Sequence, residues 1–428
     1  MSIASSAAAE IAERERERQR RSDAALAPMR EAVARVAGLS AEEAAADERL
    51  WHVVQAAFEV DRNIVNLNNG GVSPSPRLVQ DALRRDLARA NEAPAYTMWS
   101  VLEPEVEVVR ARLAALFGCD AEEVAITRNA CESLETCLFG FDLRPGDEVV
   151  TTNQDYPRTL AALRQRAQRD GIVVRALSFP VPPSSPADLV ARFRAALTPR
   201  TRVLLVSHMT YLTGQIFPVA EICRMGREAG IEVVVDGAHA LAQLPFRRDD
   251  LDCDYYGATL HKWVMAPHGT GFLYVRRSKI AGHWPLMAPP SDMRADDIRK
   301  FEQIGTHPAA LHNAAREALA FHEVLGTERK SARLRYLRDR WARRLARHPR
   351  VRMLTDPSPE MSCGLGTFAV SGMEPAVLAD ALWDRARIFV VAFAHEEFAG
   401  VRVTPSFYTR VEDVDAFAEE VERILGGL

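Results

Sequence analysis

Short apolar runs alternate along the chain with stretches in which apolar residues recur every three or four positions. The short runs are typical of strands buried on both faces of a sheet, and the longer repeat is typical of helices. Strands are expected at 64–67, 124–127, 148–151, 172–174, 203–206, 231–236 and 255–259. Helices are expected at 51–58, after Pro76, from Cys131, from Arg158 and at 218–229. This order predicts an α/β fold with a large domain whose mainly parallel sheet is covered by helices.

The pattern changes toward the end of the chain. A long arginine-rich helical stretch at 314–347 precedes expected strands at 367–370, 389–391 and 401–403 and expected helices at 375–387 and 411–425. We therefore expect a smaller C-terminal α+β domain. The first residues are rich in Ala, Glu and Arg, which predicts a solvated helix or a frayed tail. The predicted units are a polar segment 1–47, a segment 48–75 that packs with the small domain, a large domain 76–305 and a small domain 306–428.

The charge balance limits the classes of partner. Lys and Arg number 54 against 58 Asp and Glu, a net charge of −4, so a broad basic surface for nucleic acid or anionic membrane is not expected. No stretch has the length of a membrane span or the pattern of a signal peptide, so we expect a cytoplasmic protein. Six cysteines without a C-x-x-C pair indicate buried thiols in a reducing compartment, and we expect no metal site.

Lysine is almost absent from the chain, because only four of the 54 basic residues are lysines. Three of them, Lys279, Lys300 and Lys330, stand among other charges, where an arginine on a solvated face would serve equally well. Lys262 instead follows the expected strand 255–259. A desolvated lysine can lose its proton, whereas arginine cannot, so this position indicates chemistry. A lysine that merely extends to solvent from the end of a strand is the alternative interpretation.

Polar groups follow three of the expected strands. Asp236 ends the strand 231–236, Lys262 follows the strand 255–259, and a helix from Cys131 follows the strand 124–127. The carboxyl ends of parallel strands meet at one edge of a sheet, where ligands bind. A lysine for a Schiff base, a helix terminus for a phosphate and an acid for a pyridine nitrogen are what pyridoxal phosphate requires.

The chain resembles the class V aminotransferase superfamily of fold-type I pyridoxal-phosphate enzymes, and within it the isopenicillin N epimerase-like group. The resemblance covers most of the chain from about residue 50. It is carried by the segments NLNNGGVSP (66–74), DGAHA (236–240), LHK (260–262), GTGFLYV (269–275) and VRVTPSFY (401–408). It implies the PLP-dependent transferase fold and pyridoxal 5'-phosphate as cofactor. It also implies a homodimer with shared sites, in which Thr270 contacts the phosphate across the interface.

The resemblance assigns roles to individual residues. Lys262 would form the Schiff base, Asp236 would hold the pyridine nitrogen, and His239 would lie near the ring hydroxyl. The residues expected to bind the cofactor are these three with Ala130, Cys131, Tyr156, Thr259, His261 and Thr270. Those expected to bind substrate are Arg402, Asn69 and Gly70.

Several of these assignments have competing interpretations. Relatives often carry threonine where this chain has Cys131. Because cysteine has no hydroxyl, one hydroxyl contact to the phosphate would be missing here. Tyr156 fits either a ring stacked on the cofactor or a half-buried loop tyrosine, and Arg402 fits either a carboxylate ligand or a surface arginine. Second choices around the site are Thr210, Tyr211, Tyr96, Trp99 and His395.

The activity implied is deprotonation of an amino-acid substrate at Cα, through an external aldimine and a quinonoid, followed by epimerisation, in specialised metabolism. Transamination and cleavage by a Cα–Cβ or β-elimination lyase stay open, and so does the second acid that epimerisation needs opposite Lys262. Cysteine desulfuration is disfavoured because the segment 392–400 contains no cysteine. The chain lacks the glycine-rich motif of nucleotide-binding enzymes, so that class is disfavoured as well. A non-catalytic scaffold would have no reason to keep Lys262, Asp236 and Arg402.

Overall fold

The computed structural model describes residues 3–426, and its centre is a seven-stranded sheet. The strand order is β2(Val124–Thr127), β8(Gly271–Val275), β7(Tyr255–Thr259), β6(Glu232–Asp236), β5(Thr201–Ser207), β3(Glu148–Thr152) and β4(Val173–Leu177). Neighbouring strands are parallel except that β8 runs antiparallel to β2 and β7. The predicted α/β fold with a mainly parallel sheet is confirmed.

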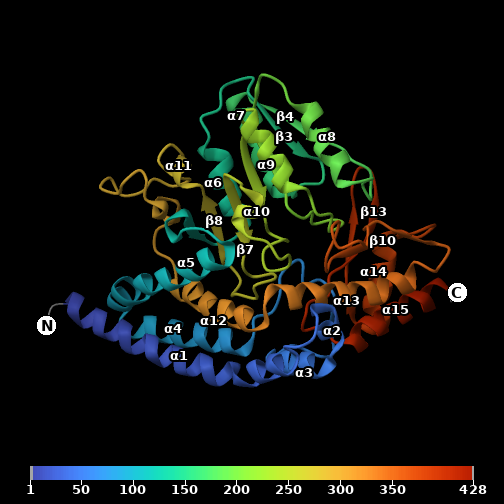
Figure 1. Ribbon diagram of the computed structural model, residues 1–428, viewed down its shortest axis with the longest axis horizontal. Helices are drawn as coiled ribbons and strands as arrows, with labels where there is room; N and C mark the ends of the chain where they lie inside the picture. The colour runs from blue at the N-terminus through green and yellow to red at the C-terminus, as the bar shows by residue number, and fades with distance from the viewer. Residues whose placement is uncertain (1–2, 427–428) are drawn as a thin grey trace.

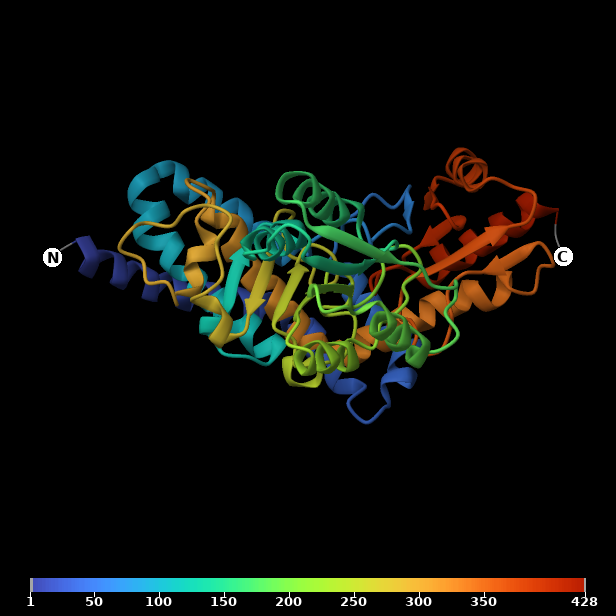
Figure 2. The ribbon, with the colours of Figure 1, turned by 90° about the horizontal axis from the view of Figure 1, so that it is seen from above.

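Both faces of this sheet are covered, because neighbouring residues of one strand enter different hydrophobic clusters. In β6, Val233 and Val235 belong to one cluster, whereas Val234 belongs to the other. Figure 2 shows the strands between helices. The helices around the sheet are α5(Glu103–Phe117), α6(Ala130–Gly140), α7(Pro157–Asp170), α8(Pro186–Ala196) and α9(Val219–Glu228). Short elements complete the unit: η2(Ala121–Glu123), α10(Arg248–Leu251), α11(Arg277–Ile280) and η3(Ile298–Glu302).

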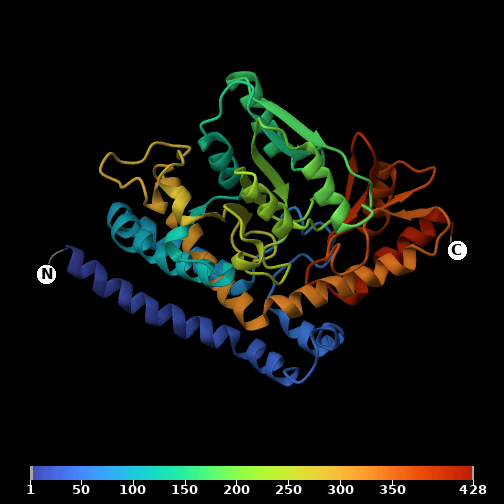
Figure 3. The ribbon, with the colours of Figure 1, turned by 45° about the horizontal axis from the view of Figure 1, so that its top comes forward.

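The N-terminal segment forms a long helix, α1(Ile3–Arg35), along one side of the molecule (Figure 3). One face of this helix is buried, so the expectation of a solvated helix is wrong for that face. Arg18 is 7% exposed and pairs with Asp86 and Glu317. The alternating charges are therefore used partly for buried ion pairs. The neighbouring helices are α2(Ala41–Ala46), α3(Glu48–Ala56), α4(Arg77–Glu92) and the unpredicted π-helix η1(Tyr96–Leu102).

The arginine-rich stretch predicted as one helix forms two, α12(Ala309–Leu325) and α13(Thr327–Leu345). They are separated at Gly326, whose φ of 80° lies in the region that favours glycine and cannot continue a helix. In Figure 1, α13 runs from below the large sheet toward the C-terminal elements. Leu334 of α13 belongs to a hydrophobic cluster of the large sheet, whereas Leu345 in its last turn belongs to the C-terminal cluster.

The C-terminal part contains a four-stranded antiparallel sheet, β12(Val391–Ala394), β13(Ala399–Val403), β10(Gly366–Val370) and β9(Val351–Met353), in that order. It packs with α14(Pro375–Ala386) and α15(Val411–Leu425) in a hydrophobic cluster of its own. The early strand β1(Val65–Asn66) pairs with β11(Ile388–Phe389). The domain boundaries given above stay predictions.

Two of the three lysines expected on solvated faces are buried. Lys279 is partly exposed and pairs with Glu232 at 2.5 Å. Lys300 is 5% exposed and donates to the carbonyls of Ile280 and Ala295, at 2.6 and 2.8 Å. Lys330 is 1% exposed. The prediction was wrong for Lys300 and Lys330 because charged sequence neighbours do not show which face of a helix a residue occupies.

The six cysteines are free thiols, four of them buried and two partly buried, as predicted. None of the helices among residues 3–426 combines the length and apolar character needed to cross a bilayer.

Candidate active site

A cavity of about 430 Å³ lies at the carboxyl ends of the central strands. The predicted site residues that line it are Gly70, Ala130, Cys131, Tyr156, Asp236, His239, Thr259, His261, Lys262 and Arg402. These residues come from the ends of strands of the large sheet and the segments that follow them, from the start of α6, from the segment after β1 and from β13 of the C-terminal sheet. The fold therefore brings together side chains that are up to 332 positions apart, from Gly70 to Arg402, in one cavity.

Lys262 lies three residues after β7, beyond the carboxyl end of that strand at the edge of the sheet. Burial is the main cause that lowers the pKa of its amine to about 8, and the nearby Arg402 charge acts in the same direction. Its Nζ lies 3.1 Å from Nε2 of His239. An amine with this pKa is deprotonated far more often near neutral pH than an ordinary lysine, and the neutral amine is the form that attacks an aldehyde.

Asp236 is the last residue of β6. Burial raises the pKa of its carboxyl to about 6, opposed by a hydrogen bond from the Ala238 amide to Oδ1 at 2.9 Å and by the charge of Lys262. Within residues 3–426 this carboxylate forms no ion pair. A buried acid of this kind is stabilised by a cation that enters the cavity beside it.

The residue after Asp236 must be glycine for steric reasons. A methyl group on Gly237 would overlap the ring of the fully buried Tyr256. We expect Gly237→Ala to destabilise the fold by about 1–3 kcal/mol, measured by urea unfolding. Gly282→Ala is the control, because nothing lies within 4 Å of the added methyl. Equal stability of the two variants would contradict this packing.

His239 is the buried neighbour of the Lys262 amine. It is 3% exposed, and burial keeps its pKa well below the ordinary value, so the ring is neutral. Its Nδ1 is buried and has no partner among the described residues. The Trp263 ring is 6.3 Å away, centroid to centroid. A neutral imidazole with an unpaired nitrogen is available to a polar group in the cavity.

One end of the cavity is suited to an anion. The helix α6 begins at Ala130, and the amides of Ala130 and Cys131 belong to its first turn, where no intrahelical acceptor exists. Asn129 caps the helix through the Glu132 amide at 2.9 Å. The Thr259 hydroxyl lies 2.9 Å from Nε2 of His261. These donors on one wall fit a phosphate group.

Arg402, on β13, lies at another wall and is 8% exposed. Its guanidinium donates to the Tyr211 carbonyl at 2.8 Å and to Oδ1 of Asn68 at 2.9 Å, while Nε is buried without a partner. Burial lowers its pKa to about 10, and no carboxylate among residues 3–426 pairs with it. The surface interpretation of Arg402 is therefore wrong, since this is a buried cation that lacks an anion.

Some predicted residues lie outside the cavity. Asn69 is fully buried, where Nδ2 donates to the Thr404 carbonyl and Oδ1 accepts from Tyr408. Thr270 is also buried and donates to the Pro267 carbonyl at 2.7 Å. Among the second choices, Tyr211 lines the cavity, while the others do not: Thr210, Tyr96, Trp99 and His395. Trp99 is instead 56% exposed.

Tyr156 is a cavity residue that is 36% exposed. Its ring is nearly perpendicular to that of Tyr211, with 5.4 Å between the centroids. Both its exposure and its position on the wall agree with a ring that can contact a ligand, and its stacking role stays a prediction.

Asp155 was missed by the sequence reasoning. This buried carboxylate accepts hydrogen bonds from the hydroxyls of Thr151, Thr152 and Ser207 and from the amides of Thr152 and Ser207. It thereby ties the ends of β3 and β5 together beside Asp236. Its position four residues after the predicted strand 148–151 was the available signal. Asn68 accepts a hydrogen bond from Arg402, and nothing in the sequence except its place in the segment 66–74 pointed to that contact.

The residues present fit pyridoxal phosphate. The cavity combines a deprotonatable amine, an unpaired buried acid, a neutral imidazole with an orphaned nitrogen, and a helix terminus with free amides. Each of these features is costly or unsatisfied in the protein alone and is satisfied by one part of that cofactor.

Comparison with known proteins identifies the family. The family Aminotransferase class-V matches residues 65–417. The chain belongs to the class V aminotransferase family. It is a pyridoxal-phosphate-dependent enzyme, and its family agrees with the resemblance seen in the sequence.

Individual relatives extend this result. The chain is 29% identical to isopenicillin N epimerase of Streptomyces clavuligerus over 88% of its length and 98% of the relative's. It is 30% identical to isopenicillin N epimerase of Amycolatopsis lactamdurans over 87% of its length and 98% of the relative's. The solved structure of the cystine C–S lyase C-DES with cysteine persulfide has a TM-score of 0.74 and 25% identity, covering 84% of this chain and 97% of that one.

Proposed function

We propose that this enzyme epimerises an amino-acid substrate at Cα, in the manner of its isopenicillin N epimerase relatives. The observation that carries the proposal is Arg402, a buried guanidinium without an acid partner in the same cavity as Lys262 and Asp236. A substrate carboxylate supplies the missing anion through a bidentate contact. The similarity over 98% of the epimerases supports the same reaction class.

The cofactor, when bound, supplies an electron sink for negative charge at the substrate Cα. In our proposal Arg402 holds the substrate carboxylate, which fixes Cα relative to Lys262. The Lys262 amine accepts the Cα proton, as its pKa of about 8 allows near neutral pH. Asp236 keeps a compensating negative charge at the buried end of the cavity. Delivery of a proton from solvent to the opposite face of Cα yields the Cα epimer.

Desulfuration fits the site less well. The loop that follows β12 and leads to Arg402 contains no cysteine. Cys131 is the cysteine among the residues that line the cavity, and burial raises the pKa of its thiol, which disfavours a thiolate nucleophile. Its place at the start of α6 further suggests the anion-binding wall.

Product analysis in deuterated water tests the proposal. Candidates such as isopenicillin N and single L-amino acids are incubated with the cofactor-loaded enzyme, and products are separated by chiral chromatography and mass spectrometry. Epimerisation predicts the Cα epimer with one deuterium at Cα. Formation of a keto acid instead would identify transamination, and loss of a side-chain fragment would identify a lyase. Either result without the epimer would contradict epimerisation.

Arg402→Ala should lower the activity toward amino acids much more than the activity toward the corresponding amines. We expect the rate constant kcat/KM for exchange of the Cα hydrogen of amino acids to fall about 10²–10³-fold, because a charge-assisted bidentate contact is lost. The matching decarboxylated amines should change by less than about threefold, since they offer no carboxylate. Arg402→Lys is the matched control that keeps a cation without the planar fork. Equal losses for acids and amines would refute the assignment.

A further inference from the structure

Lys330 is a buried lysine in the first turn of α13 that the proposed reaction does not use. It is 1% exposed, and its Nζ donates to the carbonyl of Trp263, the residue that follows Lys262. The same Nζ lies 2.9 Å from Nδ1 of His322 and 4.7 Å from the centroid of the Phe407 ring. No carboxylate among residues 3–426 pairs with it.

The number of hydrogen-bond acceptors around Lys330 explains why a lysine, and not an arginine, occupies this position. Burial lowers the pKa of Lys330 to about 7, so the neutral amine is readily populated. A neutral amine carries two N–H groups, and the site offers two acceptors, the Trp263 carbonyl and His322 Nδ1. An arginine would bring five donors and a permanent charge into this space. Lysine is therefore retained here in a chain that otherwise uses arginine.

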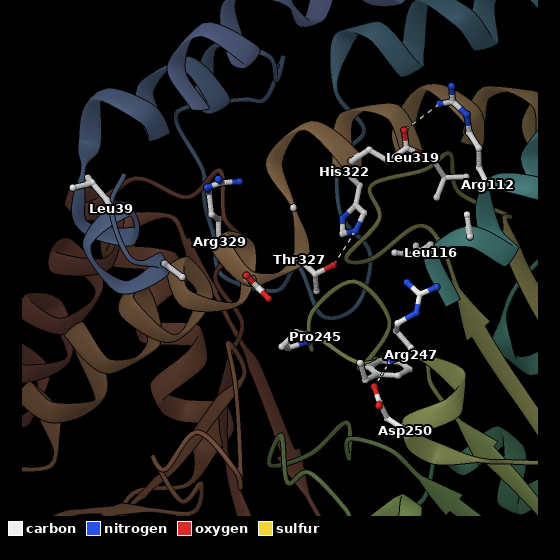
Figure 4. Close-up of a pocket in the computed structure, with 16 residues that line it drawn as sticks. Leu39, Arg112, Leu116, Pro245, Arg247, Asp250, Leu319, His322, Thr327 and Arg329 are labelled. Carbon is white, nitrogen blue, oxygen red and sulfur yellow. Dashed lines mark hydrogen bonds and ion pairs between the residues drawn. The ribbon is translucent and has the colours of Figure 1, made fainter. Parts of the chain in front are cut away.

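The hydrogen bonds continue from Lys330 to a second cavity. With Nδ1 of His322 accepting from Lys330, its Nε2 carries the proton and donates to the Thr327 hydroxyl at 3.1 Å. His322 and Thr327 line a cavity of about 740 Å³ beside α12 and α13, where Figure 4 shows the two side chains pointing toward each other. A continuous chain of polar groups thus links this cavity to the segment of Lys262.

The next residue of the same turn holds a second segment of the active site. The Ser331 hydroxyl donates to the Gln243 carbonyl at 2.7 Å, and the Gln243 side chain donates to the His239 carbonyl. The first turn of α13 therefore binds the backbone behind Lys262 and, through Gln243, the backbone of His239. Lys262 and His239 are themselves in contact, with 3.1 Å between Nζ and Nε2.

We propose that Lys330 is a positioning residue that fixes the Trp263 carbonyl and thereby the placement of the Lys262 amine. The proposal rests on the role of Lys262 in the proposed function. Lys330 touches neither cofactor nor substrate in this account, because it lies behind the wall of the active-site cavity. His322 and Thr327 orient the Lys330 amine from the other side.

The test compares Lys330→Met with Lys300→Met. Methionine keeps an unbranched apolar side chain in each buried position and removes the amine. Lys300 is a matched control because it is also buried and its Nζ also has two hydrogen-bond partners, the carbonyls of Ile280 and Ala295, neither of which is next in sequence to a residue that lines the active-site cavity. Cofactor affinity is measured by absorbance titration, stability by urea unfolding, and turnover by exchange of the Cα hydrogen with deuterium.

For Lys330→Met we expect a dissociation constant for the cofactor about tenfold higher and kcat for exchange about tenfold lower, as loss of one buried hydrogen bond implies. KM for the amino acid should stay within about twofold, because the contacts of Arg402 are untouched. Lys300→Met should lose comparable stability without changing cofactor affinity or kcat. Equal effects of the two variants on affinity and kcat would overturn the proposal.

A milder variant decides the question if Lys330→Met does not fold. Thr327→Val removes one hydroxyl at the partly exposed end of the series of hydrogen bonds that leads to Lys330. This variant should raise the dissociation constant for the cofactor about threefold. Unchanged affinity in Thr327→Val would then overturn the proposal. Failure of the proposed function looks different, since in that case the wild-type enzyme itself would form no Cα epimer, whatever the affinity of the variants for the cofactor.

Discussion

Replacement of Lys262 with alanine is expected to abolish the covalent attachment of the cofactor and to lower the rate of Cα hydrogen exchange by about 10⁴-fold or more. The amine has two roles in this account, because it would hold the aldehyde carbon of the cofactor until the substrate amine displaces it and, once displaced, would accept the Cα proton. No other lysine is placed to replace it. Lys330 lies behind the wall of the cavity, but its Nζ is engaged by the Trp263 carbonyl and by His322.

The measurement for Lys262→Ala is the visible absorbance of the cofactor-loaded protein, followed by deuterium exchange on a substrate amino acid. Lys279→Ala is the control, because this partly exposed lysine pairs with Glu232 and lies away from the cavity. A small primary amine added to the buffer should restore part of the rate, since alanine leaves space where the side chain was. An unchanged absorbance in Lys262→Ala would place the attachment elsewhere.

Asp236→Asn is expected to bind the cofactor but to slow Cα hydrogen exchange by about 10²–10³-fold. Asparagine has the same shape, and its carbonyl oxygen can still accept the Ala238 amide that now bonds Oδ1 at 2.9 Å. The fold should therefore persist. What is lost is the negative charge that favours a proton on the ring nitrogen of the cofactor, and without that proton the ring accepts electrons poorly.

Two measurements separate this electrostatic effect from a structural one. The dissociation constant of the cofactor and the urea midpoint should change little in Asp236→Asn, whereas the exchange rate should fall. The matched comparison is Asp155→Asn, which alters a carboxylate that accepts from Thr151, Thr152 and Ser207 and should mainly lower stability. Exchange at the wild-type rate in Asp236→Asn would contradict the role of this acid.

Local patterns were sufficient to predict most of the central sheet and the position of the cavity. Buried strands such as β6 have continuous apolar runs, and Asp236 and Lys262 stand where those runs stop. The break at Gly326 was less visible, because a single glycine is compatible with a continuing helix in a sequence rich in helix formers. The roles of the cavity residues stay predictions.

Features that depend on tertiary contacts were not predictable from the pattern. The burial of Lys330 and of Arg18 depends on partners 67 and 299 positions away, Trp263 and Glu317, which no local window contains. The buried network around Asp155 is similar, since the hydroxyl and amide of Ser207 arrive from a strand 52 positions later. Such groups look like ordinary charged residues until the fold places their partners.

The central claim is that Lys262 is the attachment site of the cofactor. It is tested most directly by reducing the cofactor-loaded wild-type enzyme with borohydride, digesting it and locating the reduced cofactor by peptide mass spectrometry. Our account predicts a modification on Lys262, with Lys279, Lys300 and Lys330 unmodified. A modification on Lys330, whose pKa is also lowered by burial, or on no lysine at all, would contradict it.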